Sequence, residues 1–197
     1  MTDTNYSISV VIPLFNEEES LPELTEKIHA VATRMNVVCE IIFVDDGSTD
    51  ASYNVIQKLK QQYVSVKALR FRKNFGKSTA LSEGFKMATG TYVITMDADL
   101  QDDPEEIPNL VAKLKEGNDL VSGWKKVRHD PISKTIPSRF FNFVTRLMSG
   151  IRLHDFNCGL KAYRREVIKD VNLYGELHRY IPVLAKWEGY RKITEIA

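Results

Sequence analysis

Apolar residues along this chain fall into two alternating kinds of segment. Short runs rich in apolar residues are typical of strands buried on both faces of a sheet. Longer segments carry apolar residues every three or four positions, which predicts amphipathic helices. The predicted strands of the first half lie at 8–14, 40–46, 66–71 and 91–96. The apolar positions of the predicted helices are Leu21, Leu24, Ile28 and Val31, then Val55, Ile56, Leu59 and Tyr63, then Leu81, Phe85 and Ala88, and last Ile107, Leu110, Val111 and Leu114.

Strands that alternate with helices in this way predict an α/β fold with a mainly parallel central sheet. The second half of the chain is less regular. We expect a strand near 121–126, a helix over 138–148, a loop over 150–159 and short strands at 160–163 and 192–197. No linker or internal repeat divides the chain, so we expect one domain over residues 1–197. Because the sequence stops inside the last predicted strand, we also expect further C-terminal residues.

Composition narrows the classes of function. Lysine and arginine total 27 and aspartate and glutamate total 26, which gives a formal net charge of +1. Without a basic stripe, nucleic acid is not expected to be the main partner. Cys39 and Cys158 form no disulfide or zinc pattern, which suits a reducing compartment. No apolar run reaches the roughly 18 residues that span a bilayer, and no signal peptide is evident, so we expect a soluble chain.

Polar residues follow three of the predicted strands. Asn16-Glu17 comes after the first strand, Asp45-Asp46 after the second and Asp97-Asp99 after the fourth. In parallel α/β sheets, ligands bind beyond the carboxyl ends of the strands. These acidic strand ends are therefore expected to converge on one ligand-binding edge.

Asp97 and Asp99 carry the most specific signal. Two residues apart in a strand, both carboxylates leave the same face, with Cα atoms about 6–7 Å apart. Two like charges this close need a counter-charge, and the hard cations Mg²⁺ and Mn²⁺ prefer oxygen ligands. The competing interpretation is a solvated acidic loop before a helix. Helix capping accounts for Asp103, Glu105 and Glu106, but it does not account for two acids at a strand end, so we favour a metal site.

Two glycine-containing turns carry weaker signals. Asp45-Asp46-Gly47-Ser48 is either only a tight turn or a place where an acid accepts hydrogen bonds from a base or a ribose. Gly76-Lys77-Ser78 matches the end of a phosphate-binding loop, but position 71 is Phe instead of the required glycine, so that motif is rejected. Lys77 at a helix N-terminus can still bind an anion, and a solvated lysine is the competing interpretation.

The second half of the chain is rich in basic residues. Most are expected on solvated faces, and a subset near the acidic edge could hold a phosphorylated acceptor or a leaving diphosphate. The aromatic residues at 140, 141 and 143 either pack into the core, which we favour, or face a membrane beside Arg139 and Arg146. The basic residues are Lys125, Lys126, Arg128, Lys134, Arg139, Arg146, Arg152, Lys161, Arg164, Arg165 and Arg179.

Five segments, taken together, resemble a known enzyme family. They are residues 10–18 (VVIPLFNEE), 45–50 (DDGSTD), 74–77 (NFGK), 96–101 (MDADLQ) and 155–161 (DFNCGLK). Each is weak alone, but in this order they are specific and cover nearly the whole chain. The chain thereby resembles the inverting glycosyltransferases of the GT-A fold, a Rossmann-like three-layer α/β domain. The nearest branch is that of dolichyl-phosphate mannose synthase and bacterial polyprenyl-phosphate glycosyltransferases.

The resemblance implies a role for each matching residue. Asp97, Asp99 and Gln101 would lie at a divalent cation, Mg²⁺ or Mn²⁺, and at the donor diphosphate. Asp155 and Asp99 would be the catalytic residues near the reacting centre. The residues implied to bind a nucleotide-sugar are Pro13, Phe15, Glu17, Val44, Asp46, Lys77, Asp97, Ala98, Asp99, Gln101 and Lys125. The residues implied on the acceptor-phosphate side are Arg139, Lys161 and Arg179, with His178 and Tyr180 beside the last.

The activity implied is the inverting, metal-dependent transfer of a sugar from a UDP- or GDP-sugar to a polyprenyl phosphate, undecaprenyl or dolichyl. A lipid phosphate is already largely ionised near pH 7, because its second pKa is about 6, so no strong general base is needed. Many relatives continue into membrane-spanning helices. We therefore expect such helices to be missing here and the protein to work at the membrane surface, on the cytoplasmic side of the cell membrane. Formation of a homo-oligomer stays open.

Other functions also stay open. A transferase acting on a saccharide hydroxyl, in cell-surface polysaccharide or lipopolysaccharide synthesis, would need a base, for which Asp155 is the candidate. A non-catalytic nucleotide-sugar-binding module would have no need of the intact acid pair. A kinase or nucleotidyltransferase is less favoured.

Overall fold

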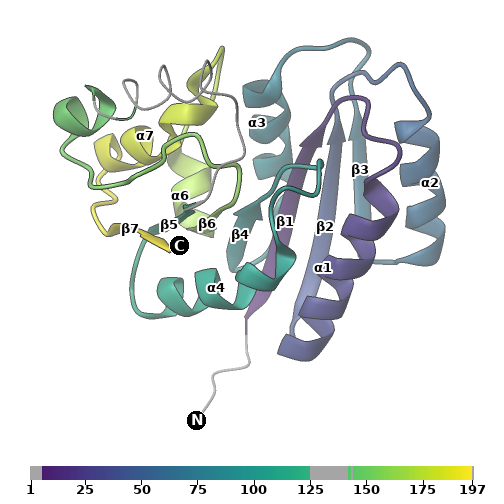
Figure 1. The fold of residues 1–197 in the computed structure, drawn as a ribbon, viewed down its shortest axis with the longest axis horizontal. Helices are drawn as coiled ribbons and strands as arrows, with labels where there is room; N and C mark the ends of the chain where they lie inside the picture. Colours follow the sequence, from purple (N-terminus) through teal and green to yellow (C-terminus); the bar gives the residue numbers. More distant parts are fainter. Residues whose placement is uncertain (1–5, 125–141, 143, 197) are drawn as a thin grey trace.

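The computed structural model describes residues 6–124, 142 and 144–196. Strands and helices alternate through the first half of the chain, which confirms the α/β fold predicted from the apolar pattern (Figure 1). The elements of this half are β1 (Ser7–Leu14), α1 (Leu21–Met35), β2 (Val38–Asp45), α2 (Ser52–Gln62), β3 (Val66–Arg70), α3 (Lys77–Met87), β4 (Tyr92–Thr95), η1 (Pro104–Glu106) and α4 (Ile107–Lys115).

The second half contains short elements. The strands near 121, 160 and 192 were predicted, whereas the short helices over 165–170, 177–180 and 181–187 were not. Of the helix predicted over 138–148, residues 142 and 144–149 are helical, and the rest lie outside the described residues. Nowhere in the described part of the chain is a helix long and apolar enough to cross a membrane. The elements are β5 (Leu120–Gly123), β6 (Lys161–Arg164), α6 (Arg165–Asp170), η2 (Leu177–Tyr180), α7 (Ile181–Trp187) and β7 (Ile193–Ile196).

Seven strands form one sheet in the order β3-β2-β1-β4-β6-β5-β7. β1 runs parallel to β2 and β4, β2 runs parallel to β3, and β5 runs parallel to β7. Only β6 breaks the pattern within this sheet, because it is antiparallel to both of its neighbours, β4 and β5. The central sheet is therefore mainly parallel, as predicted.

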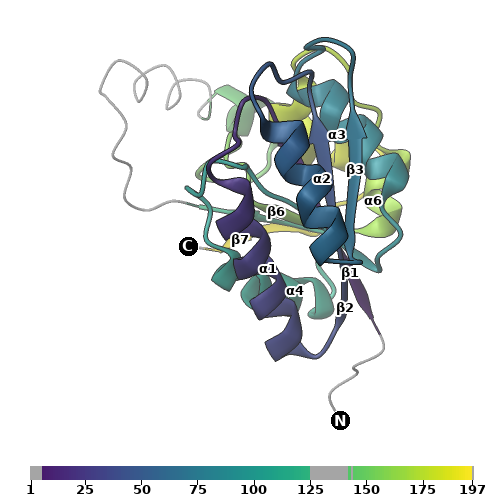
Figure 2. The ribbon, with the colours of Figure 1, turned by 90° about the vertical axis from the view of Figure 1, so that its right-hand side faces the viewer.

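Helices cover both faces of the sheet and complete a three-layer arrangement (Figure 2). α1, α2 and α4 share one core with Val10 and Ile12 of β1, and α3, α6 and α7 share the other with Val11. Successive strand side chains point to opposite faces, so β1 contributes to both cores. α3 approaches the sheet closely at Gly84, where a Cβ atom would lie 2.3 Å from Cγ1 of Val11. Only glycine fits at this contact.

The carboxyl ends of β1, β2 and β4 meet at one edge of the sheet, because these neighbouring strands are parallel. The chain leaves each of these strands in a loop that carries acidic residues. The fold therefore places the polar strand ends together, as the sequence predicted.

Candidate active site

The loops after β1 and β2 hold each other in place. Asn16 adopts a left-handed backbone conformation with φ of 59°, and its side-chain oxygen accepts a hydrogen bond from the backbone N–H of Thr49 at 2.8 Å. In return, the hydroxyls of Ser48 and Ser52 accept hydrogen bonds from the backbone N–H groups of Asn16 (2.9 Å) and Glu17 (2.8 Å). These contacts fix Glu17 at the edge of the sheet and give the serines of the second loop a structural role.

Asp46 joins the end of β2 to the start of α3. Its carboxylate is buried and accepts hydrogen bonds from the backbone N–H groups of Phe75 (2.7 Å) and Gly76 (2.9 Å). Gly76 precedes the helix with φ of 91°, a conformation that glycine adopts without a steric penalty. Asp46 therefore sets the position of Lys77, the first residue of α3.

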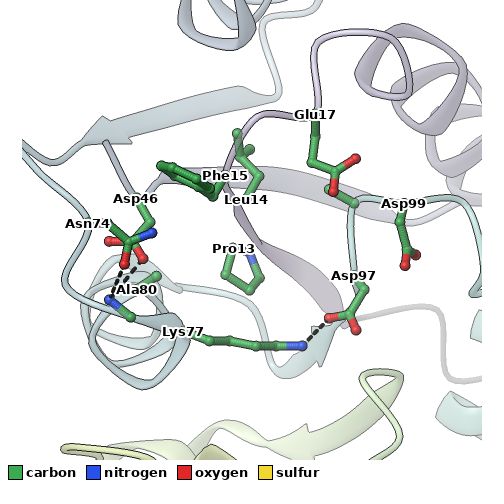
Figure 3. A pocket seen from close by; sticks show the side chains of 12 residues that line it. Pro13, Leu14, Phe15, Glu17, Asp46, Asn74, Lys77, Ala80, Asp97 and Asp99 are labelled. Atoms are coloured by element: carbon green, nitrogen blue, oxygen red, sulfur yellow. Dashed lines mark hydrogen bonds and ion pairs between the residues drawn. The ribbon is translucent and has the colours of Figure 1, made fainter. Parts of the chain in front are cut away.

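The residues after β4 form a tight acidic turn. The backbone N–H of Asp97 donates to the buried carboxylate of Asp102 at 3.2 Å, and that of Gln101 donates to Asp99 at 3.1 Å. Leu100 is left-handed with φ of 60°, which costs roughly 1–2 kcal/mol for a residue other than glycine. Such conformations cluster at ligand-binding sites. The turn places Asp97 and Asp99 on the same wall of a cleft (Figure 3).

This cleft, of about 370 Å³, lies over the carboxyl ends of the parallel strands. Lys77 reaches across it towards β4, with Nζ 2.5 Å from Oδ1 of Asp97 (Figure 3). Phe15 at the end of β1 also lines the cleft and is 42% exposed, so part of its ring is free to contact a ligand. The lining residues are Pro13, Leu14, Phe15, Glu17, Asp46, Asn74, Gly76, Lys77, Ala80, Asp97, Ala98 and Asp99.

The cleft carries an excess of negative charge. Burial, and next the charge of Asp99, raises the pKa of Glu17 above its usual range, and Asp97 acts in the same direction. Lys77 is the cation that faces these carboxylates from α3. Oxygen donors with surplus negative charge fit a hard divalent cation. Within the described ranges, no three His, Cys, Asp or Glu side chains are arranged to hold a metal ion by themselves, so the fit rests on Asp97 and Asp99.

A second, narrower depression shares Pro13, Lys77 and Asp97 with the cleft. Its character is cationic, because Lys161 and Arg179 also line it. Lys161 on β6 is buried, and its ammonium group donates to the backbone carbonyl of Cys158. Burial lowers the pKa of Lys161. The lining residues are Pro13, Lys77, Leu81, Thr95, Asp97, Phe156, Asn157, Cys158, Gly159, Lys161, Tyr163, His178, Arg179 and Ile181.

The structure brings most of the predicted site residues together. The predicted acceptor-side residues that are described, Lys161 and Arg179, line the second depression. The predicted donor-side residues that line the cleft are Pro13, Phe15, Glu17, Asp46, Lys77, Asp97, Ala98 and Asp99.

Other predicted residues lie elsewhere. Val44 is fully buried in the core that β2 shares with α3, and it does not line the cleft. Gln101 lines a neighbouring depression of about 160 Å³. Asp155 is buried, and its Oδ1 accepts a hydrogen bond from the backbone N–H of Asn157 at 2.9 Å. The predicted residues Lys125 and Arg139, and the aromatic residues at 140, 141 and 143, lie outside the described residues.

Several residues that line the site were not among the predicted site residues. Asn74 and Gly76 line the cleft, and their place just before α3 was a usable signal. Gly159 packs against Asp97, because a Cβ atom there would lie 2.5 Å from Cγ of Asp97. The Gly159 carbonyl also accepts a hydrogen bond from the Thr95 hydroxyl at 2.8 Å. Its only sequence signal was its membership of the segment 155–161.

Comparison with known sequences identifies the family of the chain. The family model Glycosyl transferase family 2 matches residues 9–171. A dodecaprenyl-phosphate galacturonate synthase of Rhizobium johnstonii is 40% identical over 178 residues, which cover 89% of this chain and 53% of the relative. An undecaprenyl-phosphate 4-deoxy-4-formamido-L-arabinose transferase of Shewanella sediminis is 41% identical over 188 residues, which cover 95% of this chain and 56% of the relative. The chain thus spans about half the length of these relatives.

Solved structures share the fold. Glucosyl-3-phosphoglycerate synthase from Mycobacterium tuberculosis, crystallised with Mn²⁺, UDP and phosphoglyceric acid, gives a TM-score of 0.76 at 22% identity over 97% of this chain and 68% of that chain. Mannosyl-3-phosphoglycerate synthase from Rubrobacter xylanophilus gives a TM-score of 0.76 at 18% identity, over 96% of this chain and 65% of that chain. At these identities the likeness shows the GT-A fold alone. The family model and the relatives at about 40% identity show that the chain belongs to glycosyl transferase family 2.

Proposed function

We propose that the chain transfers a sugar from a nucleoside-diphosphate sugar to the phosphate of a polyprenyl lipid. The observation that carries this proposal is the adjacency of an acidic cleft and a cationic depression that share Lys77 and Asp97. A donor diphosphate with its cation suits the cleft. The phosphate of an anionic acceptor would lie at the mouth of the depression, whose volume of about 20 Å³ is too small to enclose it. The relatives at 40% and 41% identity are named for dodecaprenyl and undecaprenyl phosphate, which supports this class of acceptor.

On the donor side, Asp97 and Asp99 would hold Mg²⁺ or Mn²⁺. A bound cation of this kind neutralises the charge that develops on a leaving diphosphate. The cleft volume of about 370 Å³ lies within the usual range of small-molecule pockets. Crystals of the Mycobacterium tuberculosis neighbour with Mn²⁺ and UDP support a nucleotide and a divalent cation in this fold. An assay that compares UDP-sugars with GDP-sugars distinguishes uracil from guanine as the donor base.

On the acceptor side, Lys161 and Arg179 would bind the phosphate. One phosphate oxygen attacks the anomeric carbon from the face opposite the diphosphate, and the bond to the diphosphate breaks as the new bond forms. This inverts the anomeric centre. A phosphate monoester needs no strong base to become a nucleophile, because its second pKa is about 6. Asp155, buried beside Asn157, would orient the acceptor side without taking a proton.

An apolar hollow of about 360 Å³ supports a lipid acceptor. Arg179 lines the cationic depression, and the next residue, Tyr180, lines this hollow. Met148 and Trp187 at the hollow are 83% and 76% exposed, so a large apolar surface faces outward. The polyprenyl chain would lie here with its phosphate near Arg179, and the protein would work at a membrane surface. The hollow is lined by Val144, Thr145, Met148, Ser149, Tyr180, Val183 and Trp187.

The test is transfer to undecaprenyl phosphate in detergent micelles from a panel of UDP- and GDP-sugars with Mn²⁺ or Mg²⁺, read by mass spectrometry of the lipid. We expect a glycosylated lipid with one class of donor. Glycerol 3-phosphate, a phosphate without the apolar chain, is expected to be a poor acceptor. Transfer to a saccharide hydroxyl with none to the lipid would overturn the proposed acceptor.

Asp99→Ala tests the metal assignment in the same assay. We expect transfer to fall more than about 100-fold, because a metal contributes several kcal/mol of charge stabilisation in such reactions. The melting temperature should stay near that of the wild type. Asp103→Asn is the matched control, because Asp103 lies in the same acidic stretch outside the cleft and caps η1 through the Glu105 N–H at 3.0 Å. Near-normal turnover by Asp99→Ala would contradict the metal site.

A further inference from the structure

A serine and a histidine that are 100 residues apart in sequence are bonded to each other beside the cationic depression. Ser78, the second residue of α3, is fully buried. Its hydroxyl oxygen lies 3.0 Å from Nδ1 of His178 and accepts a hydrogen bond of 3.0 Å from the His178 backbone N–H. These two bonds join the first turn of α3 to η2.

The surroundings of His178 keep its ring neutral. Burial, and next the charge of Lys77, lowers the pKa of His178 to about 4, with Arg179 and Lys161 acting in the same direction. Glu176 is the acid that opposes them, 3.8 Å from Nδ1 and largely exposed. At neutral pH the imidazole therefore carries a single proton.

The hydrogen-bond partners favour one place for that proton. The Ser78 oxygen already accepts from the His178 backbone N–H, so its own hydroxyl proton is available for Nδ1. In that arrangement Nδ1 is an acceptor, and we expect the ring proton on Nε2. The buried Ser78 hydroxyl and the partly buried His178 ring then satisfy each other without any charge.

We propose that Ser78 and His178 are positioning residues that set the distance between the donor half and the acceptor half of the active site. Lys77 directly precedes Ser78 and pairs with Asp97 at 2.5 Å, while Arg179 directly follows His178 and lines the cationic depression. The bonded pair therefore holds Arg179 in a fixed relation to Lys77. The proposal rests on the proposed function, because it assigns Arg179 to the acceptor phosphate.

The kinetic test compares Ser78→Ala, His178→Ala and the double variant, with undecaprenyl phosphate as the acceptor. We expect each single change to raise the acceptor KM about tenfold, which corresponds to ~1.4 kcal/mol. The binding of UDP with Mn²⁺, measured by calorimetry, should not change. The double variant should be no worse than Ser78→Ala, because Ser78→Ala already removes both bonds, whereas His178→Ala leaves the bond from its backbone N–H to Ser78.

Two further variants separate positioning from a general loss of structure. His178→Asn should recover most of the acceptor KM, because its side-chain oxygen can replace Nδ1 as the acceptor for Ser78. Thr79→Ala is the control, because it removes the neighbouring hydroxyl of the same helical turn, which donates to the Phe75 carbonyl at 3.1 Å. Additive losses in the double variant, or weakened UDP binding in the single variants, would overturn the proposal.

A readout independent of activity keeps this proposal separate from the proposed function. In ¹⁵N NMR spectra of the histidine rings, we expect His178 to carry its proton on Nε2 at pH 7 and to titrate near pH 4. In Ser78→Ala the pKa should stay low, because burial and the charge of Lys77 cause the shift, while the preference of the ring proton for Nε2 should be lost. A wild-type ring that carries its proton on Nδ1 would overturn the pair. If no sugar reaches the lipid but the ring behaves as expected, the proposed function fails and the pair stands.

Discussion

Asp97 is constrained from three directions before any ligand binds. Its carboxylate pairs with Lys77 at 2.5 Å, and its backbone N–H donates to Asp102 at 3.2 Å. Gly159 closes the third side, because a Cβ atom there would lie 2.5 Å from Cγ of Asp97. A carboxylate fixed in this way loses little freedom when a ligand binds, which favours affinity.

Gly159→Ala should therefore displace the Asp97 carboxylate. We expect kcat/KM for transfer to fall roughly 100-fold, because a displacement of about 1 Å at a reacting site has effects of this size. The affinity for Mn²⁺, measured by calorimetry, should fall with it. Gly189→Ala is the control, because it adds a methyl group to open space at φ of 99° and costs stability without touching the site. Unchanged Mn²⁺ affinity in Gly159→Ala would contradict this role of Gly159.

At the scale of single residues, the place of Asp97 and Asp99 just after an apolar run indicated the cleft that they line. The predicted reason was wrong, because β4 ends at Thr95 and both acids lie in the turn that follows, where the pleat of a strand does not set the direction of their side chains. The roles of Gly159 and of Ser78 with His178 could not be predicted from the residues alone. Each depends on contacts between segments tens of residues apart, and no periodicity reports such contacts. Val44 shows the converse, because the family resemblance implied a place at the site while its side chain is buried in the core.

At the scale of elements, Glu40 of β2 connects neighbouring strands near their amino ends. This is the edge of the sheet opposite the active site. The Glu40 carboxylate accepts hydrogen bonds from the hydroxyl of Ser9 on β1 (2.5 Å) and from the backbone N–H of Thr89 before β4 (2.7 Å). Lys67 of β3 forms an ion pair with it at 2.5 Å. Burial alone would raise the pKa of Glu40, but the bonds from Lys67, Ser9 and Thr89 lower it to about 2.

Glu40→Gln should destabilise the fold and leave the active site unchanged. We expect a loss on the order of 1–2 kcal/mol at pH 7, because a neutral amide cannot accept all of these bonds. The folded pKa of about 2 lies below the ordinary 4.5, so this stabilisation is complete above pH 4.5 and is lost as the pH falls towards 2. The difference in melting temperature from the wild type, measured by calorimetry, should shrink over that range.

A second substitution checks the assignment to Glu40. Glu26→Gln changes an exposed acid on α1. At every pH its melting temperature should stay close to that of the wild type at the same pH. A difference between Glu40→Gln and the wild type that stays the same from pH 7 down to pH 2 would contradict the role of the carboxylate.

The first half of the fold could be predicted because its strands are continuous apolar runs and its helices span several turns. The missed helices are short, six residues for α6 and seven for α7, so the apolar period has too few repeats to be recognised. The position of β6 could not be predicted either. The chain places it antiparallel between β4 and β5, a pairing that local sequence does not encode.

At the scale of the whole molecule, two halves of the chain build the two halves of the proposed site. The acidic cleft comes from the loops after β1, β2 and β4, whereas Lys161 and Arg179 come from the second half. The net charge of +1 conceals this separation of charge. β6 brings the halves together, because it pairs with β4 and carries Lys161 to the side of Asp97.

This separation of charge predicts how the whole molecule responds to a donor nucleotide. Bare UDP brings further negative charge to a cleft that already holds Glu17, Asp97 and Asp99, so it should bind weakly unless a divalent cation accompanies it. With Mn²⁺ and UDP at about 100 times the dissociation constant, the native state gains ~2.7 kcal/mol. For a chain of this size that corresponds to a rise in melting temperature of roughly 5–10 °C. Thermal-shift measurements with and without a chelator, on the wild type and on Asp99→Ala, test this. Equal stabilisation by UDP when the chelator is present would contradict a metal-dependent donor site.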